Sequence, residues 1–571
     1  MSVDTNNAAF QDALNLIQYT RQSVFLTGKA GTGKSTFLRY VCEHTKKKHV
    51  VLAPTGIAAI NAGGSTMHSF FKLPFYPLLP DDPNLSLQRG RIHEFFKYTK
   101  PHRKLLEQIE LVIIDEISMV RADLIDAIDR ILRVYSHNLR EPFGGKQLLL
   151  VGDVFQLEPV VKNDEREILN RAYPTPYFFS ARVFSQIDLV SIELQKVYRQ
   201  TDSVFVSVLD HIRTNTAGAA DLQLLNTRYG SHIEESEADM YITLATRRDT
   251  VDSINEKKLA ELTGEPITFE GSIEGDFPES SLPTSQELVL KPGAQIIFIK
   301  NDFDRRWVNG TIGVIAGIDE EEETIYVITD DGKECDVKRE SWRNIRYRYN
   351  EKTKEIEEEV LGSFTQYPIR LAWAITVHKS QGLTFSRVVI DFTGGVFAGG
   401  QAYVALSRCT SLDGIQLKKP INRADIFVRP EIVNFAGRFN DRQAIDKALK
   451  QAQADVQYAA AARAFDKGDM EECLEQFFRA IHSRYDIEKP VPRRLIRRKL
   501  GIINTLQEQN KKLKEQMREQ QERLRQYAHE YLLMGNECIT QAHDARAAIA
   551  NYDKALSLDP NSVSYTHLRA H

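Results

Sequence analysis

Residues 24–36 have the residue types and spacing of a loop that binds phosphate. An apolar run leads into the sequence Gly-Lys-Ala-Gly-Thr-Gly-Lys-Ser, and a helical pattern of apolar residues follows it. Glycines let backbone N–H groups close on an anion, and the N-terminus of the following helix adds its positive dipole. At this spacing Lys34 would reach the β- and γ-phosphates, and the Ser35 hydroxyl would coordinate Mg²⁺. The stretch predicts a nucleoside triphosphate site with contacts from Gly28, Ala30, Gly31, Thr32, Gly33, Lys34, Ser35 and Thr36.

Two further apolar runs end in polar side chains that could complete such a site. Residues 111–114 lead into Asp115 and Glu116, and residues 147–151 lead into a segment that contains Gln156. We expect Asp115 to hold Mg²⁺ and Glu116 to orient and deprotonate the attacking water. Gln156 would sense the γ-phosphate by donating to it. Three strands that each end in a polar cluster predict a doubly wound α/β sheet with its ligand at the carboxyl edge.

Residues 49–71 and Gln11 carry weaker signals. A buried-strand pattern at residues 49–53 runs into a stretch rich in small, hydroxyl-bearing and then aromatic residues. Such residues can hold backbone phosphates, and Phe70 could stack on a base. The alternative, an ordinary connection with Phe70 and Phe71 in the core, stays open. Gln11 could read an adenine edge through its amide, or it could be an ordinary residue on a surface helix.

Composition limits the class of protein. The 571 residues are 42% hydrophobic and 27% charged, with a net charge of −4, as in a soluble globular protein of about three to five units. There is no global basic field, so a nucleic-acid surface would have to be a local groove. The five cysteines have no metal-ligand spacing, which predicts reduced thiols. Without a leader or a membrane-spanning run, we expect a cytoplasmic protein, nucleoid-associated if bacterial.

Three regions break the α/β rhythm. Residues 73–107 carry closely spaced prolines and then an aromatic, basic stretch, which indicates a small insertion that could act as a wedge. Residues 288–362 predict a small β-barrel insertion, in which the run at 342–349 either extends towards nucleic acid or forms a solvated edge strand. Residues 438–571 are predicted to be helical, with two helix–turn–helix stretches at 458–481 and 531–560. Between these stretches, apolar residues at roughly heptad spacing are Leu506, Leu513, Met517 and Leu524.

The order of the motifs resembles that of superfamily 1 DNA helicases, and within them the petite-integration-frequency family and its RecD-like relatives. The matching stretches are residues 28–35, 54–59, 66–71, 115–119, 152–157, 197–200, 373–384 and 403–408. The resemblance covers about residues 1–437. It implies two RecA-like P-loop ATPase domains, residues 1–165 and 166–437, with ATP and Mg²⁺ in the cleft between them and an SH3-like barrel at 288–362. Residues 438–571 resemble tetratricopeptide repeats, which would dock a protein partner.

The resemblance also assigns roles that spacing leaves open. Arg199 and Arg408, from the second domain, would contact the γ-phosphate as arginine fingers and neutralise charge in the transition state. They complete a catalytic set with Lys34, Asp115, Glu116 and Gln156. Gly382 maps to a nucleotide-binding position. The positions that map near single-stranded DNA are Thr55, Gly56, His68, Ser69, Phe70, His378 and Lys379.

Two classes of function follow. The preferred one is a monomeric motor in which ATP hydrolysis closes and opens the cleft, moves single-stranded DNA and splits duplex ahead. The resemblance implies 5′-to-3′ travel and action on forks, R-loops or G-quadruplexes in genome maintenance. The alternative is an ATP-gated scaffold without unwinding, against which the two arginines argue. RNA as the substrate stays open from the residues alone.

Overall fold

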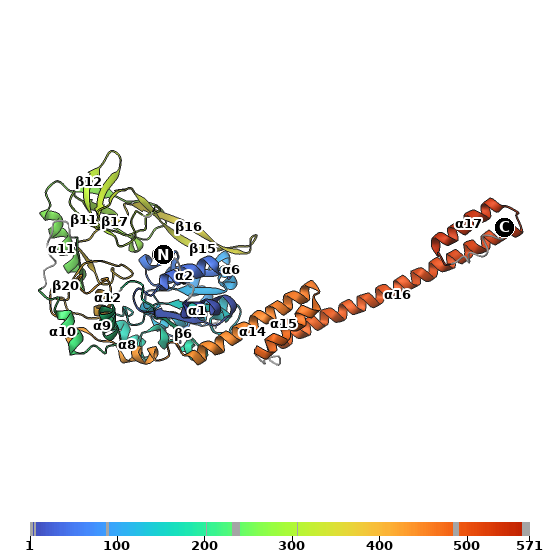
Figure 1. Cartoon of the computed structure of the whole chain (residues 1–571), viewed down its shortest axis with the longest axis horizontal. Coiled ribbons are helices and arrows are strands. Elements are labelled where there is room, and N and C mark those ends of the chain that lie inside the picture. The colour runs from blue at the N-terminus through green and yellow to red at the C-terminus, as the bar shows by residue number, and fades with distance from the viewer. Residues whose placement is uncertain are drawn as a thin grey trace. The chain divides into compact units, whose positions relative to one another are not determined.

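The computed structural model describes residue 4 and residues 7–86, 91–200, 202–230, 240–304, 306–483 and 490–561. The chain divides into two compact units, Met1–Ser483 and Arg484–His571. Among the described helices, none combines the length and the apolar character that crossing a bilayer requires. The first unit contains two parallel sheets, an antiparallel β module and a pair of helices (Figure 1).

A six-stranded parallel sheet forms the core of the first domain. Its strand order, β3-β2-β4-β5-β1-β6, requires the crossover connections of a doubly wound fold. Successive residues alternate between the two faces, so that Val24 and Leu26 face one core and Phe25 faces the other. The strands are β1 (Val24–Gly28), β2 (His49–Ala53), β3 (Ser65–Thr66), β4 (Leu111–Ile114), β5 (Gln147–Val151) and β6 (Val190–Leu194).

Helices cover both faces of this sheet. One core contains residues of α1 and α2, and the other contains residues of α4, α6 and α7. Helix α1 begins at Ala8 because the Asn7 side chain accepts from two N–H groups of its first turn. The elements are α1 (Ala8–Tyr19), α2 (Lys34–His44), α3 (Gly56–Ala62), α4 (Met67–Phe71), η1 (Pro83–Leu85), α5 (Arg91–Phe96), α6 (Lys100–Gln108), η3 (Ile117–Met119), α7 (Ala122–Tyr135), η4 (Pro142–Gly145), α8 (Asn163–Leu169), η5 (Phe178–Ser180) and η6 (Arg182–Gln186).

The first domain extends further along the chain than predicted. Strand β6 pairs with β1 in parallel, from Val24 opposite Val190 to Gly28 opposite Leu194. The predicted boundary at residue 165 is therefore wrong, because the strand that completes the sheet comes after it.

The predicted insertion at residues 73–107 forms η1, α5 and α6. Its aromatic run packs inward, because Phe96 and Tyr98 are buried and the Tyr98 hydroxyl donates to the carbonyl of Phe71. The exposed aromatic side chains lie earlier, at Phe75 and Tyr76, and Phe75 is 81% exposed. Phe75 and Tyr76 are therefore the large aromatic residues of this insertion that face outward, and a wedge role for residues 73–107 stays a prediction.

A four-stranded parallel sheet, ordered β18-β7-β19-β20, forms the second domain. Ala30 and Leu157 of the first domain belong to the hydrophobic core of the second, so the two domains share an apolar contact. Two parallel sheets of this kind confirm the predicted α/β class. The elements are α9 (Ser203–Arg213), α10 (Ala219–Asn226), β7 (Ile242–Ala245), α11 (Arg248–Glu261), β18 (Ala374–Thr376), β19 (Val388–Asp391), α12 (Gln401–Leu406), β20 (Ile415–Leu417), η8 (Arg423–Asp425) and α13 (Pro430–Ala436).

An antiparallel β module interrupts the second domain between α11 and β18. Its five-stranded sheet, β14-β13-β12-β11-β17, has a core of its own around Trp307, Ile325 and Tyr367. The predicted limits of 288–362 are too narrow, because the module begins at β8 and ends at β17. The elements are β8 (Ile267–Glu270), β9 (Ser272–Gly275), η7 (Glu279–Ser281), β10 (Glu287–Leu290), β11 (Gln295–Phe298), β12 (Ile312–Asp319), β13 (Thr324–Thr329), β14 (Glu334–Val337), β15 (Glu340–Asn350), β16 (Glu355–Gln366) and β17 (Ile369–Leu371).

A two-stranded ribbon, β15 with β16, extends from the module to the first domain (Figure 1). Tyr347 and Tyr349 near its tip are buried in the core of the first domain. The N–H of Val51 in β2 donates to the Tyr347 hydroxyl at 3.3 Å. The solvated-edge interpretation of residues 342–349 is therefore wrong, because the ribbon packs against the first domain.

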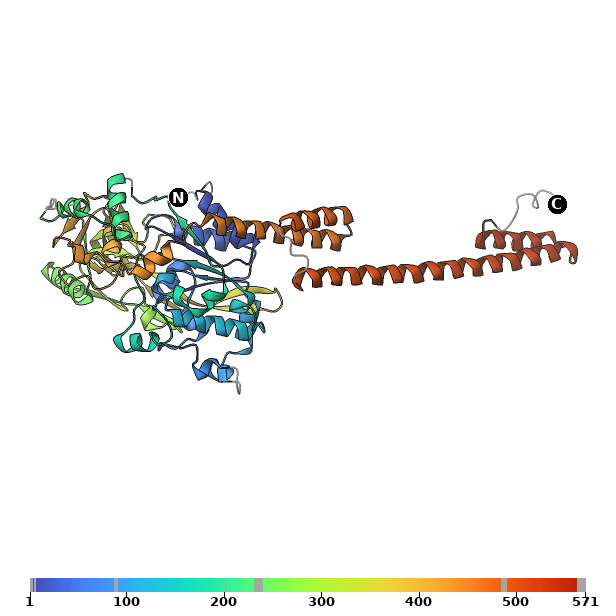
Figure 2. The same cartoon turned by 90° about the horizontal axis from the view of Figure 1, so that it is seen from below.

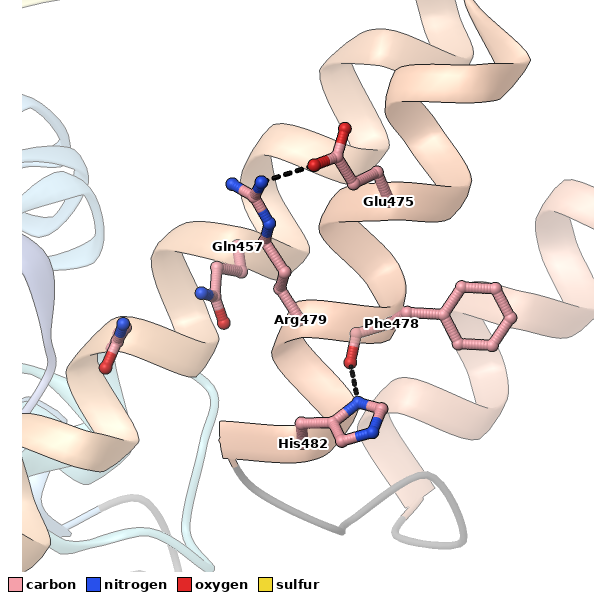
Figure 3. A pocket seen from close by; sticks show the side chains of 6 residues that line it. Gln457, Glu475, Phe478, Arg479 and His482 are labelled. Carbon is pink, nitrogen blue, oxygen red and sulfur yellow. Dashed lines mark hydrogen bonds and ion pairs between the residues drawn. The ribbon is translucent and has the colours of Figure 1, made fainter.

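Helices α14 (Arg442–Lys467) and α15 (Met470–Ser483) form an antiparallel pair (Figure 2). The start of α14 packs on α1, where Ile445 and Ala448 join its core and Arg442 donates to Asp12 at 2.6 Å. The predicted boundary at residue 438 is therefore wrong for this pair. A pocket of about 640 Å³ opens beside the two helices, and Figure 3 shows Phe478 pointing away from the ion pair between Arg479 and Glu475.

The second unit consists of α16 (Pro490–Thr540) and α17 (Ala545–Leu558). Helix α17 folds back on the C-terminal end of α16 (Figure 2). Gly535 makes this possible, since a Cβ there would lie 2.5 Å from the ring of Tyr552. The two helix pairs agree with the predicted helix–turn–helix stretches. Their membership of the tetratricopeptide class stays a prediction.

Candidate functional site

The loop between β1 and α2 has the backbone conformation that its glycines permit. Gly31 and Gly33 have φ values of +81° and +88°, in the left-handed region that other residues rarely adopt. A Cβ on Gly31 would lie 2.5 Å from the Cβ of Arg199, so glycine also allows a close approach there. Within the loop, Lys34 Nζ donates to the carbonyls of Gly28 at 2.7 Å and Lys29 at 3.0 Å. The lysine is thus held inside the loop where a phosphate would bind.

The surroundings of Lys34 explain its charge state. Burial lowers the pKa of Lys34, and the nearby carboxylates of Asp153 and Glu116 oppose this effect. Anionic oxygens close to the ammonium group would favour its charged form further. A bound phosphate would thus replace part of the solvation that Lys34 loses on burial, and the phosphate contact of Lys34 stays a prediction.

Asp115 and Glu116 follow β4 at the same edge of the sheet. Glu116 has a φ of +50°, its N–H donates to Asp115 Oδ1 at 2.9 Å, and both residues line one cavity. Burial, and then the charge of Asp115, raise the pKa of Glu116 to about 7. Burial also raises the pKa of Asp115. Glu116 can therefore accept a proton near neutral pH.

Gln156 and Glu116 are joined by a residue from the second domain. Gln381 Nε2 donates to Glu116 Oε2 at 2.7 Å and to Gln156 Oε1 at 3.3 Å. Gln156 in turn donates to Asp153 at 3.3 Å. Gln381 lies inside residues 373–384, which match the family pattern, but no role was predicted for it from the sequence.

Arg213 fixes Asp153 across the domain boundary. Its guanidinium donates to Asp153 at 3.1 and 3.3 Å and lies 2.8 Å from Glu193, and it covers the ring of Phe155. The Arg213 side chain is only 4% exposed. Arg213 lies at the end of α9, outside every motif, so no signal in the sequence could have identified it.

Arg199 lies directly against the phosphate-binding loop. It follows β6, and the N–H of the preceding Tyr198 donates to the Gly31 carbonyl at 2.9 Å. Its guanidinium donates to the carbonyls of Ser407 at 3.2 Å and Gly382 at 3.3 Å, both in the second domain. Arg199 lies on the segment between β6 and α9, with its guanidinium on the second domain, and its role as an arginine finger stays a prediction.

Arg408 is buried at the start of the turn after α12. It donates to the carbonyl of Val404 at 2.9 Å and to the hydroxyl of Ser407 at 2.9 Å. Burial, and then the charge of Arg199, lower the pKa of Arg408 to about 9. On the same helix the hydroxyl of Tyr403 accepts from the N–H of Ala30 at 3.0 Å, which ties the second domain to the loop.

A cavity of about 400 Å³ joins the predicted nucleotide site to part of the predicted DNA site. Both domains line it. The nucleotide side contributes Ser35, Asp115 and Glu116 from the first domain and Gln381 and Gly382 from the second. The other lining residues include Thr55, Trp342, Arg370, His378 and Lys379.

Of the DNA contacts predicted in the first domain, some are exposed to solvent and one is buried. Thr55 caps α3, which begins at Gly56, and Ser69 is exposed on α4. His68 stacks on the exposed ring of Phe75 at 4.9 Å. Phe70 is only 4% exposed and packs on Phe71, so its base-stacking role is wrong and the core alternative holds.

The structure gives the positions of the predicted adenine contact, Gln11, and of the predicted metal ligands, Ser35 and Asp115. Gln11 lies half-buried on α1, and its role stays a prediction. In the described part of the chain, there is no cluster of three or more His, Cys, Asp or Glu side chains that could hold a metal ion. Ser35 and Asp115 line one cavity, which fits an Mg²⁺ whose other ligands come from phosphates and water.

Comparisons with known proteins agree with this geometry. The model of the family described as PIF1-like helicase matches residues 4–217. The chain is 33% identical over 412 residues to the ATP-dependent DNA helicase Pif1 of Campylobacter jejuni, covering 69% of this chain and 88% of that protein. It is similar to the crystal structure of Pif1 from a Bacteroides species in complex with ADP-AlF4, with a TM-score of 0.70, 41% identity and coverage of 76% of this chain and 97% of that one. A structure of Bacteroides Pif1 bound to single-stranded DNA matches with a TM-score of 0.56, 40% identity and coverage of 78% and 99%.

Proposed function

This chain belongs to the PIF1-like helicase family, and from that membership we infer what its two-domain site does: the protein is an ATP-dependent DNA helicase. The observation that carries this function is the cavity that both domains line, because it connects the nucleotide loop to residues that map near DNA. A change in the nucleotide would then alter the same cleft that holds the strand.

The phosphate-binding loop would hold the triphosphate. Lys34 would exchange its two carbonyl partners for phosphate oxygens, since charge-assisted bonds to an anion are stronger than those to a neutral carbonyl. Ser35 and Asp115 would hold Mg²⁺, which when bound neutralises charge on the phosphates.

Glu116 and Gln156 would prepare the attacking water. With its pKa raised to about 7, Glu116 is basic enough to accept the proton of a water and is ionised in a large share of molecules at neutral pH. Gln156 would orient the water or the γ-phosphate by hydrogen bonding. Gln381 holds both side chains, so the second domain takes part in positioning them.

Arg199 and Arg408 would stabilise the charge that develops on the transferred phosphoryl group. Arg199 lies beside the loop already, and its present partners are carbonyls that a phosphate could replace. Arg408 would act from the second domain, where the charge of Glu116 also favours its ionised form. Loss of the γ-phosphate would remove a shared partner of the two domains and allow the cleft to change its width.

The finer properties are also proposals. We propose travel in the 5′-to-3′ direction and action on forks, R-loops or G-quadruplexes, supported by the family resemblance of the motifs. The catalytic unit is one chain, because a single chain contributes both sides of the cavity. An intracellular, cytoplasmic location is supported by five unpaired cysteines. A protein partner would find two exposed apolar side chains on α15, Leu474 and Phe478.

Strand separation on two partial duplexes tests this function. One duplex carries a 5′ single-stranded tail and the other a 3′ tail, and each is incubated with ATP and Mg²⁺. We expect only the 5′-tailed duplex to open. Opening of the 3′-tailed duplex alone would contradict the direction, and opening of neither would leave the scaffold alternative. A 5′-tailed RNA duplex in parallel shows whether the motor requires DNA.

Lys34→Ala is the matched control. We expect it to lose ATP hydrolysis and unwinding and to keep binding of single-stranded DNA, because Lys34 lies in the phosphate-binding loop and, unlike Thr55 and His378, does not line the cavity. Full ATP turnover by this variant would overturn the assignment of the loop.

A further inference from the structure

Large apolar side chains are exposed along one stripe of α16. Leu506 is 54% exposed, and Leu513 and Met517 are 59% exposed each. We assign the residues of α16 to a heptad repeat with positions a to g. In this repeat most residues at positions a and d are apolar. The a positions are Ile503, Asn510, Met517, Leu524 and Tyr531, and the d positions are Leu506, Leu513, Gln520, Tyr527 and Met534.

Helix α17 packs on a face of α16 that is centred on the e positions and adjoins the stripe. Ala528 and Gly535, which it covers, are e positions of the same heptad. Beside α17 the d residues of the stripe stay exposed, with Tyr527 at 53% and Met534 at 49%, whereas the a residues Leu524 and Tyr531 are half-buried. The stripe runs from residue 503 to residue 534, a length of about 45 Å on an α-helix and more than four heptads. This exceeds what a chance run of surface apolar residues would cover.

We propose that α16 pairs with α16 of a second copy of this chain as a parallel two-stranded coiled coil. The polar residues in the stripe identify the occupant. In a parallel, in-register pair Asn510 faces Asn510 of the second copy, and each amide can donate to and accept from the other. Gln520 is matched in the same way. In a parallel, in-register pair of identical helices, Asn510 and Gln520 of the second copy lie at the same heights as those of the first. The polar residues of the two helices therefore match.

The residues that flank the stripe favour the parallel orientation. In a parallel pair Gln509 lies next to Lys514 of the second copy, and Gln516 next to Gln521, so no like charges meet. An antiparallel pair that keeps the polar layers matched would place Lys514 against Lys514 of the second copy. That contact is repulsive.

The pairing would link two motors. In each chain the catalytic residues precede α16, so parallel helices would hold both attachment points at the same end of the coiled coil. The second motor would then be present at high effective concentration near any strand that the first one holds. The catalytic unit would then be one chain, as the sequence predicts, but the assembled protein would be a dimer.

Light scattering or sedimentation of the full chain tests the proposal. We expect twice the mass of one 65.1 kDa chain at micromolar concentration. A variant with Leu506→Glu and Leu513→Glu should have the mass of one chain, because it places acidic groups in the apolar layers. The matched control is Leu533→Glu, which changes an equally exposed leucine of the same helix at a c position and should leave the mass unchanged. A wild-type monomer, or a double variant that still dimerises, would overturn the proposal.

Cysteine cross-linking tests the orientation. In the parallel pair Leu506→Cys faces itself and should give a disulfide-linked dimer on mild oxidation, beyond that of wild type. Thr505→Cys, at an outer c position, should not. A dimer that Leu506→Cys fails to cross-link would overturn the parallel arrangement. Circular dichroism of each variant verifies that the helices are retained, so that a lost dimer reflects the stripe itself.

Discussion

Replacement of Glu116 by glutamine should make the protein more stable and inactive at the same time. Glu116 is held in a buried turn, and burial is the main reason that its pKa rises from 4.5 to about 7. This rise means that ionising Glu116 costs about 3 kcal/mol more in the folded protein than in the unfolded chain. Glutamine has nearly the same shape and carries no charge, so the variant avoids this cost.

The pH dependence of the effect follows from the direction of the shift. A carboxyl group with a raised folded-state pKa favours the folded protein below about pH 4.5 and loses this contribution as the pH rises through about 7. The gain of Glu116→Gln should therefore be small at pH 5 and should reach about 3 kcal/mol above pH 8. For a domain of roughly 150–250 residues, this gain corresponds to a rise in Tm of roughly 6–12 °C.

The assay compares melting of the two proteins without nucleotide from pH 5 to pH 8.5. The control is Glu167→Gln, because Glu167 is exposed on α8. We expect the control to match wild type throughout and Glu116→Gln to diverge from it progressively between about pH 5 and pH 7, with a constant difference above about pH 8. A Tm difference that is absent, or that does not change with pH, would refute the account of Glu116 as a buried carboxylate.

ATP hydrolysis by the same proteins tests the predicted loss of activity. Wild-type kcat/KM for ATP should rise about tenfold between pH 6 and pH 8, as the ionised fraction of a group with a pKa near 7 does. Glu116→Gln should bind ATP and lose at least about 100-fold in turnover. A variant that is stabilised but still hydrolyses ATP would mean that another group accepts the proton.

Three further outcomes are expected. Arg213→Ala should lower the free energy of unfolding by about 3–5 kcal/mol, since it leaves the buried carboxylate of Asp153 unpaired, and Arg213→Lys should recover part of this in thermal melting. Gly31→Ala should abolish ATP binding measured by a fluorescent nucleotide analogue, because of its +81° φ and the 2.5 Å approach to Arg199. A chain that ends at residue 483 should keep DNA-stimulated ATP hydrolysis, whereas one that ends at residue 438 should melt at a lower temperature, because it lacks Ile445 and the rest of the α14 contact with α1.

The sequence predicted those parts of the site that depend on local order. The loop around Lys34 and the pair Asp115–Glu116 each follow an apolar strand directly, so a few neighbouring residues define their geometry. Gln381 and Arg213 escaped notice because each acts on a residue far away in the chain, 265 residues in the case of Gln381 and Glu116. No periodicity or spacing encodes such a contact.

The domain boundaries and the burial of single side chains were harder to predict, because they too depend on contacts between residues far apart in the chain. The boundary at residue 165 failed because β6 returns to the first sheet after a long excursion, and sequence distance gives no sign of that return. The boundary at residue 438 failed because α14 packs on α1 from the opposite end of the chain. Phe70 illustrates the limit for single residues: an aromatic after a hydroxyl-rich loop suits a core and a base-stacking surface equally well, and only the packing decides.

The ribbon of β15 and β16 has a mechanical consequence for the cleft. It is an outgrowth of the second domain, yet its tip is buried in the first through Tyr347 and Tyr349. Each strand is about 11 residues long, or roughly 35 Å, and paired strands resist stretching. The two domains are therefore joined by this ribbon as well as by the contacts at the phosphate-binding loop, and we expect the ribbon to limit how far they separate. Movement at the phosphate-binding loop would then rotate the second domain relative to the first. The length of the ribbon would limit the size of this rotation.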